Sequence, residues 1–134
     1  MIVGIGVDLV EIDRAHRMLE SLGERMLMRL FSEIEAEYIR SRAAPAQHAA
    51  VRLAAKEAAF KALAGNDLAR GITWREVEVV NASDGAPALM LAGRAAERAA
   101  ELGVTRIHVS LTHERGMAAA VVLLEAASPS RDGG

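Results

Sequence analysis

The sequence predicts an α+β fold in which a mostly antiparallel sheet packs against a long central helix. Three observations favour this class: a strand-like segment opens the chain, a run of helical segments follows, and four strand segments with one helix among them fill the second half. Strands and helices segregated in this way are typical of α+β folds. A length of 134 residues favours one core. We expect a single domain over 1–126 and a disordered tail over 127–134.

The opening segment, residues 1–12, alternates between apolar and small or polar positions, as a strand does. The face that we expect to enter the core consists of Val3, Ile5, Val7 and Leu9. The opposite face carries Gly4, Gly6 and Asp8. Asp13 is placed to cap a helix that ends near Gly23, since aspartate is a favoured N-cap residue.

Three more helices are expected before the sequence pattern changes from helical to strand-like. A short one spans 24–31, and the next begins at Ser32, which has capping-box spacing to Glu35. Pro45 then opens a long, alanine-rich helix that closes near Gly65. The remaining elements are expected strands at 74–80 and 87–93, a helix at 93–103, and a hairpin of strands 105–113 and 117–126.

Composition excludes several functional classes. The net charge of −2 and the 3% aromatic content argue against binding of nucleic acid. The absence of cysteine excludes disulfides and thiolate zinc sites. The sequence shows neither a secretory signal nor an apolar run long enough to cross a bilayer, so we expect no membrane association and a cytoplasmic location.

Asp8 is the first candidate for chemistry, because a carboxylate stands beside two glycines on one strand face. Glycines leave room for another backbone or a ligand. A carboxylate beside open space suits Mg²⁺, which takes one or two protein carboxylates and completes its shell with water and phosphate oxygens. The alternative is that the glycines accommodate a neighbouring helix and that Asp8 caps a turn.

The long helix offers a second candidate. Glu57 and Lys61 are four residues apart and share one helix face, as do Arg52 and Lys56. The alternative is that these are two ordinary surface pairs, which is the usual case for isolated pairs. The surrounding alanines make a slim helix, however, which can bring such side chains close to another element.

Near the end of the chain, the expected strand segment 108–114 carries several polar residues. The hydroxyls of Ser110 and Thr112, and the imidazole of His113, are groups that bind phosphate oxygens. The alternative is a half-exposed hairpin with polar residues facing water. Ser110 is not surrounded by the G-x-S-x-G of a hydrolase nucleophile, and the chain has no Walker-type phosphate loop.

Together these segments resemble the holo-acyl-carrier-protein synthase family, bacterial 4′-phosphopantetheinyl transferases that use coenzyme A (CoA). The resemblance runs from Met1 to about Ala126 and rests on the order and spacing of "GIGVDLVEIDR", "RLAAKEAAFKAL" and "HVSLTHERGMAAAVVLLE". It departs from the family at 64–71, where the usual Gly-Thr-Gly turn keeps only one glycine in register. We therefore expect the loop near the cofactor to differ in shape.

The resemblance implies roles for individual residues. Asp8 and Glu57 match the Mg²⁺ ligands, and Lys61 matches a lysine near the reacting phosphates. Arg52 and His113 match residues that contact CoA phosphates, His113 from a neighbouring subunit of a homotrimer. Further expected residues are Ser110 and Thr112 beside that site, and Arg14, Met18 and Arg25 for docking of an acidic acyl carrier protein.

The reaction that the resemblance implies is transfer of phosphopantetheine from CoA to a carrier serine in fatty acid biosynthesis, with release of adenosine 3′,5′-bisphosphate. The sequence leaves open whether Glu57 or a metal-bound water takes the serine proton. Two other readings use the same residues: a Mg²⁺-dependent pyrophosphate hydrolase, and a protein that docks a carrier without catalysis.

Overall fold

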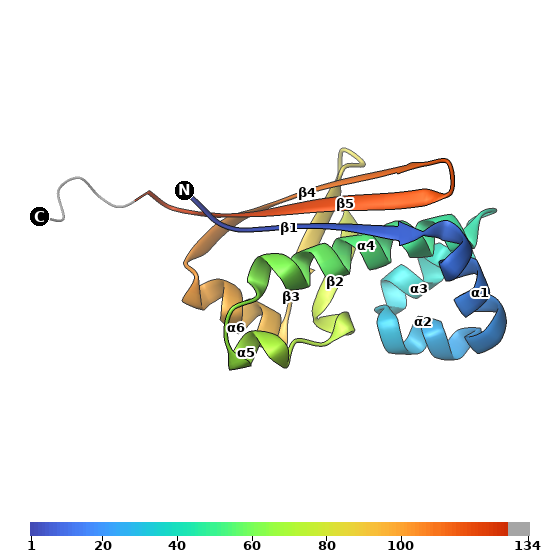
Figure 1. The fold of residues 1–134 in the computed structure, drawn as a ribbon, viewed down its shortest axis with the longest axis horizontal. Helices are drawn as coiled ribbons and strands as arrows, with labels where there is room; N and C mark the ends of the chain where they lie inside the picture. Colours follow the sequence, from blue (N-terminus) through green and yellow to red (C-terminus); the bar gives the residue numbers. More distant parts are fainter. Residues whose placement is uncertain (129–134) are drawn as a thin grey trace, which may run out of the picture.

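The computed structural model describes residues 1–128 and has the expected α+β architecture (Figure 1). Its elements are β1 (Ile2–Glu11), α1 (Ile12–Leu22), α2 (Glu24–Leu30), α3 (Glu33–Arg40), α4 (Pro45–Leu63), α5 (Asp67–Arg70), the 3₁₀ turn η1 (Trp74–Glu76), β2 (Val77–Asn81), β3 (Pro87–Leu91), α6 (Gly93–Glu101), β4 (Val104–Glu114) and β5 (Met117–Ala126). Most of the expected tail, residues 129–134, lies outside the described residues, so its disorder stays a prediction.

The strands form two antiparallel sheets, which confirms the predicted sheet type. One has the order β1-β5-β4, and the other is the β2–β3 hairpin. The expected turn between β4 and β5 is present: Arg115 has a φ of 50° and Gly116 a φ of 80°. Two consecutive positive φ values are those of a type I′ turn, whose twist matches paired strands.

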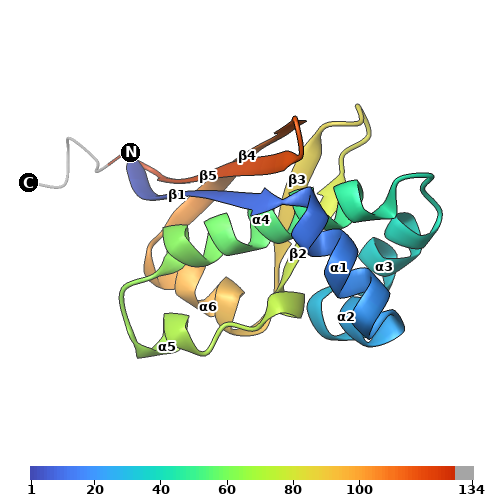
Figure 2. The same cartoon turned by 45° about the vertical axis from the view of Figure 1, so that its right-hand side comes forward.

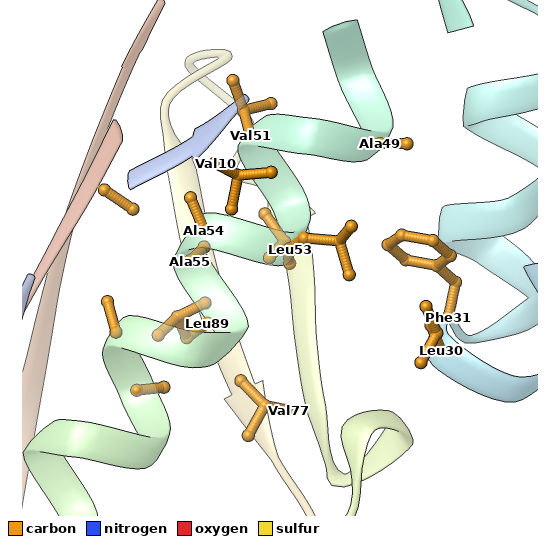
Figure 3. Close-up of a cluster of buried hydrophobic side chains, with 14 of the residues drawn as sticks. Val10, Leu30, Phe31, Ala49, Val51, Leu53, Ala54, Ala55, Val77 and Leu89 are labelled. Atoms are coloured by element: carbon orange, nitrogen blue, oxygen red, sulfur yellow. The ribbon is translucent and has the colours of Figure 1, made fainter. Parts of the chain in front are cut away.

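Helix α4 lies at the centre of the molecule, beneath the three-stranded sheet (Figures 1 and 2). It packs on β1 and β5 on one side and contacts α1, α3 and β2 on others. Figure 3 shows its side chains Leu53 and Ala54 among residues of β1, β2 and β3, with Phe31 beyond. Because neighbours surround this helix, its alanines allow close approach, and polar side chains on it lie near other elements.

The predicted alternation in β1 is confirmed, but the predicted core face is wrong within this chain. Ile5, Val7 and Leu9 are 64%, 60% and 62% exposed, whereas Gly6 is buried. The glycine face meets α4: a Cβ atom added at Gly6 would lie 1.8 Å from the backbone oxygen of Ala58. The glycines therefore make room for a helix, which was the alternative reading.

A side chain at Gly6 should be strongly destabilising for this reason. We expect Gly6→Ala to lower the free energy of unfolding by about 3 kcal/mol or more, since β1 and α4 must separate to admit the methyl group. Urea denaturation measures the change. Gly71→Ala is the matched control, because there the added Cβ meets only the flexible side chain of Arg94. A loss at Gly6 no larger than at Gly71 would contradict this packing.

Some of the predicted helix caps and element bounds are confirmed, and others are wrong. The Ser32–Glu35 capping box is confirmed. Asp13 as a helix cap is wrong: α1 begins at Ile12, its N-cap residue is Glu11, and Asp13 pairs with Arg17 within the first turns. The strand expected at 74–80 starts with a 3₁₀ turn, and α5 was not foreseen. No helix within residues 1–128 combines the length and apolarity that spanning a membrane requires.

Candidate active site

Asp8, Glu57 and Lys61 converge where β1 crosses the C-terminal half of α4. Asp8 points from the helix-facing side of β1, in the same row as Ala120 of β5. Its Oδ1 accepts a hydrogen bond of 2.9 Å from Lys61 Nζ, which also donates to the backbone oxygen of Val7 at 3.0 Å. The structure thus brings together the three residues that the sequence proposes for the reaction.

The two carboxyl groups influence each other's protonation. Burial and the adjoining Asp8 carboxyl raise the pKa of Glu57 to about 7. Burial also acts to raise the pKa of Asp8, but hydrogen bonding with Glu57 and Lys61 outweighs it and holds this pKa below its usual value. Near neutral pH the site therefore holds an ionised Asp8 beside a Glu57 that readily gains or loses a proton.

The donor set fits a hard divalent cation. Asp8 Oδ2 is buried and has no hydrogen-bond partner among the described residues, so it retains free acceptor capacity beside Glu57. No cluster of three or more acidic or histidine side chains is arranged for an ion within residues 1–128. Two carboxylates without further protein ligands suit Mg²⁺, which keeps waters and binds phosphate oxygens.

A second polar cluster surrounds the first half of α4. The guanidinium carbons of Arg42 and Arg52 lie 4.1 Å and 4.2 Å from the centre of the Tyr38 ring, which also meets the His48 ring edge-on. Burial lowers the pKa of His48, and the nearby Arg52, Arg42 and His113 lower it further. Several positive or protonatable groups therefore share this region.

Arg52 and His113 are thus placed in this cluster rather than in contact with Asp8. Arg52 is 5% exposed and donates to the backbone oxygen of His48. His113 Nε2 lies 3.0 Å from Gln47 Nε2 at the start of α4. The sequence did not suggest Tyr38, Arg42 or His48; a surplus of basic residues at 40–52 was the available signal.

Ser110 and Thr112 lie on the other face of the sheet. Ser110 pairs with Val121, which pairs with Val7, and Thr112 shares a row with Ala119 and Leu9. Paired residues point to one side of a sheet. Within one chain these hydroxyls therefore accompany the exposed apolar face of β1 and are not brought to Asp8.

The expected docking residues lie along α1 and α2. Met18 and Arg25 line a cavity of about 640 Å³ whose other walls are Leu22, Met26, Met28, Arg29 and Leu30. Arg14, one helical turn before Met18, is close enough to Glu57 to lower its pKa. The residues expected to dock the carrier thus run from the carboxylate site to an apolar hollow lined in part by arginines.

A buried ion pair beside the site was missed by sequence reasoning, which paired Lys56 with Arg52 along the helix and did not connect it to Glu35. The side chains of Lys56 and Glu35 are both fully buried, with Nζ 2.8 Å from Oε1. Lys56 also donates to the backbone oxygens of Trp74 and Val77. The pair joins α4 to α3 and to the start of β2, next to Glu57 in the chain.

The chain is similar to known proteins of one family. Residues 4–122 match the family model of the 4′-phosphopantetheinyl transferase superfamily. A holo-[acyl-carrier-protein] synthase of Methylobacterium radiotolerans is 51% identical over 94% of this chain and 95% of its own. One from Maridesulfovibrio salexigens is 46% identical over 93% of this chain and 99% of its own.

A solved structure has the same fold. The crystal structure of the Neisseria meningitidis holo-[acyl-carrier-protein] synthase superposes with a TM-score of 0.81 at 26% identity, and the match covers 93% of this chain and 99% of that one. The family model and the curated relatives both span nearly the whole described chain. The chain therefore belongs to the 4′-phosphopantetheinyl transferase superfamily, and it is an enzyme, a phosphopantetheinyl transferase of the holo-[acyl-carrier-protein] synthase type.

Proposed function

We propose that the enzyme transfers 4′-phosphopantetheine from CoA to a serine of an apo acyl carrier protein, in a Mg²⁺-dependent reaction that releases adenosine 3′,5′-bisphosphate. The observation that carries this proposal is the convergence of Asp8, Glu57 and Lys61, two carboxylates and an ammonium, at one point between β1 and α4. The proposal extends to a cytoplasmic role in fatty acid biosynthesis, which is the setting that the family resemblance implies.

Each residue has a role in this reaction. Asp8 and Glu57 would hold Mg²⁺, which when bound would neutralise charge on the pyrophosphate. The serine oxygen forms a bond to the phosphorus that carries pantetheine, and the bond to the nucleotide oxygen breaks. The serine proton passes to Glu57 or to a water beside it, the two acceptors that the sequence leaves open. Lys61 supplies an ammonium for the phosphate oxygens.

The polar cluster around the first half of α4 offers CoA a second binding region. Along α4, Arg52 and Glu57 are separated by five residues, which corresponds to a rise of about 7.5 Å. CoA carries charge in two places, its pyrophosphate and its ribose 3′-phosphate. We assign the pyrophosphate to Glu57 and Lys61, and the 3′-phosphate to the side of Arg52. His113, Ser110 and Thr112 are assigned to contacts with an adjacent subunit's ligand, as the family resemblance implies.

The experiment that tests the proposal is incubation of the purified enzyme with an apo acyl carrier protein, CoA and Mg²⁺. Mass spectrometry of the carrier should show the gain of one phosphopantetheine group, and a chelator should abolish that gain. Transfer that survives complete removal of divalent cations would contradict the role of Asp8 and Glu57. The lack of any gain with several carrier proteins would contradict the transfer itself.

Carrier docking should be electrostatic in part, because the stretch from Arg14 to Arg29 carries four arginines against two glutamates. We expect Arg25→Glu to raise the KM for an acidic carrier about tenfold while leaving the KM for CoA unchanged. Steady-state kinetics at two salt concentrations measure this, since the association rate should fall as salt rises. Arg94→Glu, at an exposed position on α6, is the control. Equal effects of the two changes would contradict docking at α2.

We further propose that the enzyme is a homotrimer with sites between subunits. Support comes from the exposed apolar face of β1, where Ile5, Val7 and Leu9 would otherwise remain in water. Light scattering should give about three times the mass of one chain, 14.3 kDa. Val7→Lys should shift the enzyme towards monomers and reduce transfer, whereas Met90→Lys, at another exposed apolar position, should not. An assembly unaffected by Val7→Lys would contradict this interface.

A pyrophosphate hydrolase with the same metal site is the second candidate. It would need no docking surface, so the cavity beside Met18 and Arg25 favours the transferase.

The loop at 64–71 is a place where CoA contacts differ from the usual pattern, because it forms α5, with Asn66 as its N-cap.

A further inference from the structure

Lys61 forms an ion pair with Asp8, the carboxylate that a divalent cation would also bind. Its Nζ lies 2.9 Å from Asp8 Oδ1, and the second oxygen of Asp8 is buried without a hydrogen-bond partner among the described residues. One side of the carboxylate is thus neutralised by the ammonium, and the other adjoins Glu57. A cation entering between Asp8 and Glu57 therefore meets a positive charge already in place.

The ammonium and a divalent cation oppose each other on one carboxylate. Two positive charges a few ångströms apart repel each other, and the burial of Asp8 reduces the screening by water on its side of the pair. The Asp8 side chain is 13% exposed and the Lys61 side chain is 57% exposed. Asp8 is fixed on the helix-facing side of β1, so Lys61 is the partner that can move.

Lys61 can leave with little penalty to the fold. It lies in the last turn of α4 on a flexible stem, and its other contact is the backbone oxygen of Val7, on an exposed residue. Water can replace the ammonium at that carbonyl. A phosphate oxygen can replace Asp8 as the anionic partner of the ammonium, because lysine binds phosphate as a mobile point charge.

We propose that Lys61 is a built-in counter-ion that competes with Mg²⁺ for Asp8, and that a phosphate ligand relieves this competition by drawing the ammonium away. The proposal rests on the metal site of the proposed function and adds a coupling to it. Mg²⁺ alone binds weakly, and CoA strengthens Mg²⁺ binding beyond what shared coordination provides. By linkage, Mg²⁺ strengthens CoA binding by the same factor.

The first experiment titrates Mg²⁺ alone into the enzyme by calorimetry at pH 8, where Glu57 is mostly ionised. We expect Lys61→Met to bind Mg²⁺ about threefold or more tightly than the unmodified enzyme, because no ion pair has to be broken. Arg94→Gln, which removes one positive charge at an exposed position on α6, should leave the affinity unchanged. Lys61→Gln is a second variant should Lys61→Met fold poorly.

The second experiment repeats the titration with CoA present at saturation. CoA should increase the Mg²⁺ affinity of the unmodified enzyme more than that of the Lys61→Met variant, by the same factor of about three or more. This measurement separates competition from a general effect of charge, because a general effect would persist unchanged with CoA bound.

The outcomes distinguish this inference from the proposed function. Equal or weaker Mg²⁺ binding by the Lys61 variants, with clear binding by the unmodified enzyme, overturns the competition and leaves the metal site intact. No Mg²⁺ binding by any of the proteins, with or without CoA, overturns both the competition and the metal site.

Discussion

Glu57→Gln should reduce phosphopantetheine transfer by about 100-fold or more. The change removes one of the two carboxylates proposed to hold Mg²⁺ and one of the two candidate acceptors of the serine proton, while keeping nearly the same shape. The comparison is the initial rate of carrier modification, measured by mass spectrometry. Glu97→Gln removes an exposed carboxylate from α6 and should have no effect. A Glu57→Gln rate within about threefold of the unmodified enzyme would exclude both proposed roles.

The same residue should give Mg²⁺ binding a characteristic pH dependence. Burial and the adjoining Asp8 raise the pKa of Glu57 to about 7, and the ion binds the deprotonated carboxylate. Below this pH a proton must be released for each ion bound, so the affinity should fall about tenfold from pH 8 to pH 6 and level off above pH 8. Calorimetry between pH 6 and pH 8 tests this as part of the same prediction, and Glu57→Gln should lose the dependence.

Lys56→Met should be the most destabilising of the substitutions at charged residues. It removes the cation that faces Glu35, both side chains being fully buried, and leaves an uncompensated carboxylate inside the protein. Breaking one partner of such a pair costs about 3–5 kcal/mol. Urea denaturation at a fixed protein concentration measures the loss, since any assembly would add to the apparent stability.

A double variant identifies the cause. Glu35→Gln removes the stranded charge but retains an oxygen that accepts from the backbone nitrogens of Ser32 or Val79. Lys56→Met combined with Glu35→Gln should therefore be more stable than Lys56→Met alone. If the single variant loses less than about 1 kcal/mol, the pair does not hold α3, α4 and β2 together as described.

The order of elements could be predicted because it rests on local signals. Pro45 at a helix start, the Ser32–Glu35 box and Gly116 in the last turn act on their own neighbours in sequence. The core face of β1 could not be predicted in this way. Alternation distinguishes two faces, but only the position of α4 shows that the glycine face is covered and the apolar one exposed.

The site shows the same division. Glu57 and Lys61 share a helix face by spacing alone, but their contact with Asp8, about fifty residues away in sequence, follows from the resemblance and not from any pattern in the chain. The Lys56–Glu35 pair joins residues 21 positions apart on separate helices. Lys56 had a detectable signal, since alanines on both sides of it indicate a helix that is covered all round and cannot leave every charge in water.

The roles proposed for Ser110 and Thr112 depend on the proposed neighbouring subunit. They lie on the sheet face opposite Asp8, together with Val7 and Leu9. Sequence spacing places hydroxyls on one face of β4 but contains no information about a second chain. The proposed contact of these hydroxyls with CoA therefore requires the proposed trimer. Disruption of the assembly by Val7→Lys tests both proposals.

The most direct test of the central account measures both products of one reaction. Enzyme, CoA, Mg²⁺ and an apo acyl carrier protein are combined, and the modified carrier and the adenosine 3′,5′-bisphosphate are quantified together over time. The account predicts that they appear in equal amounts and that neither forms without the carrier. Release of the nucleotide without modification of the carrier would contradict it, and would identify the site between Asp8, Glu57 and Lys61 as that of a pyrophosphate hydrolase.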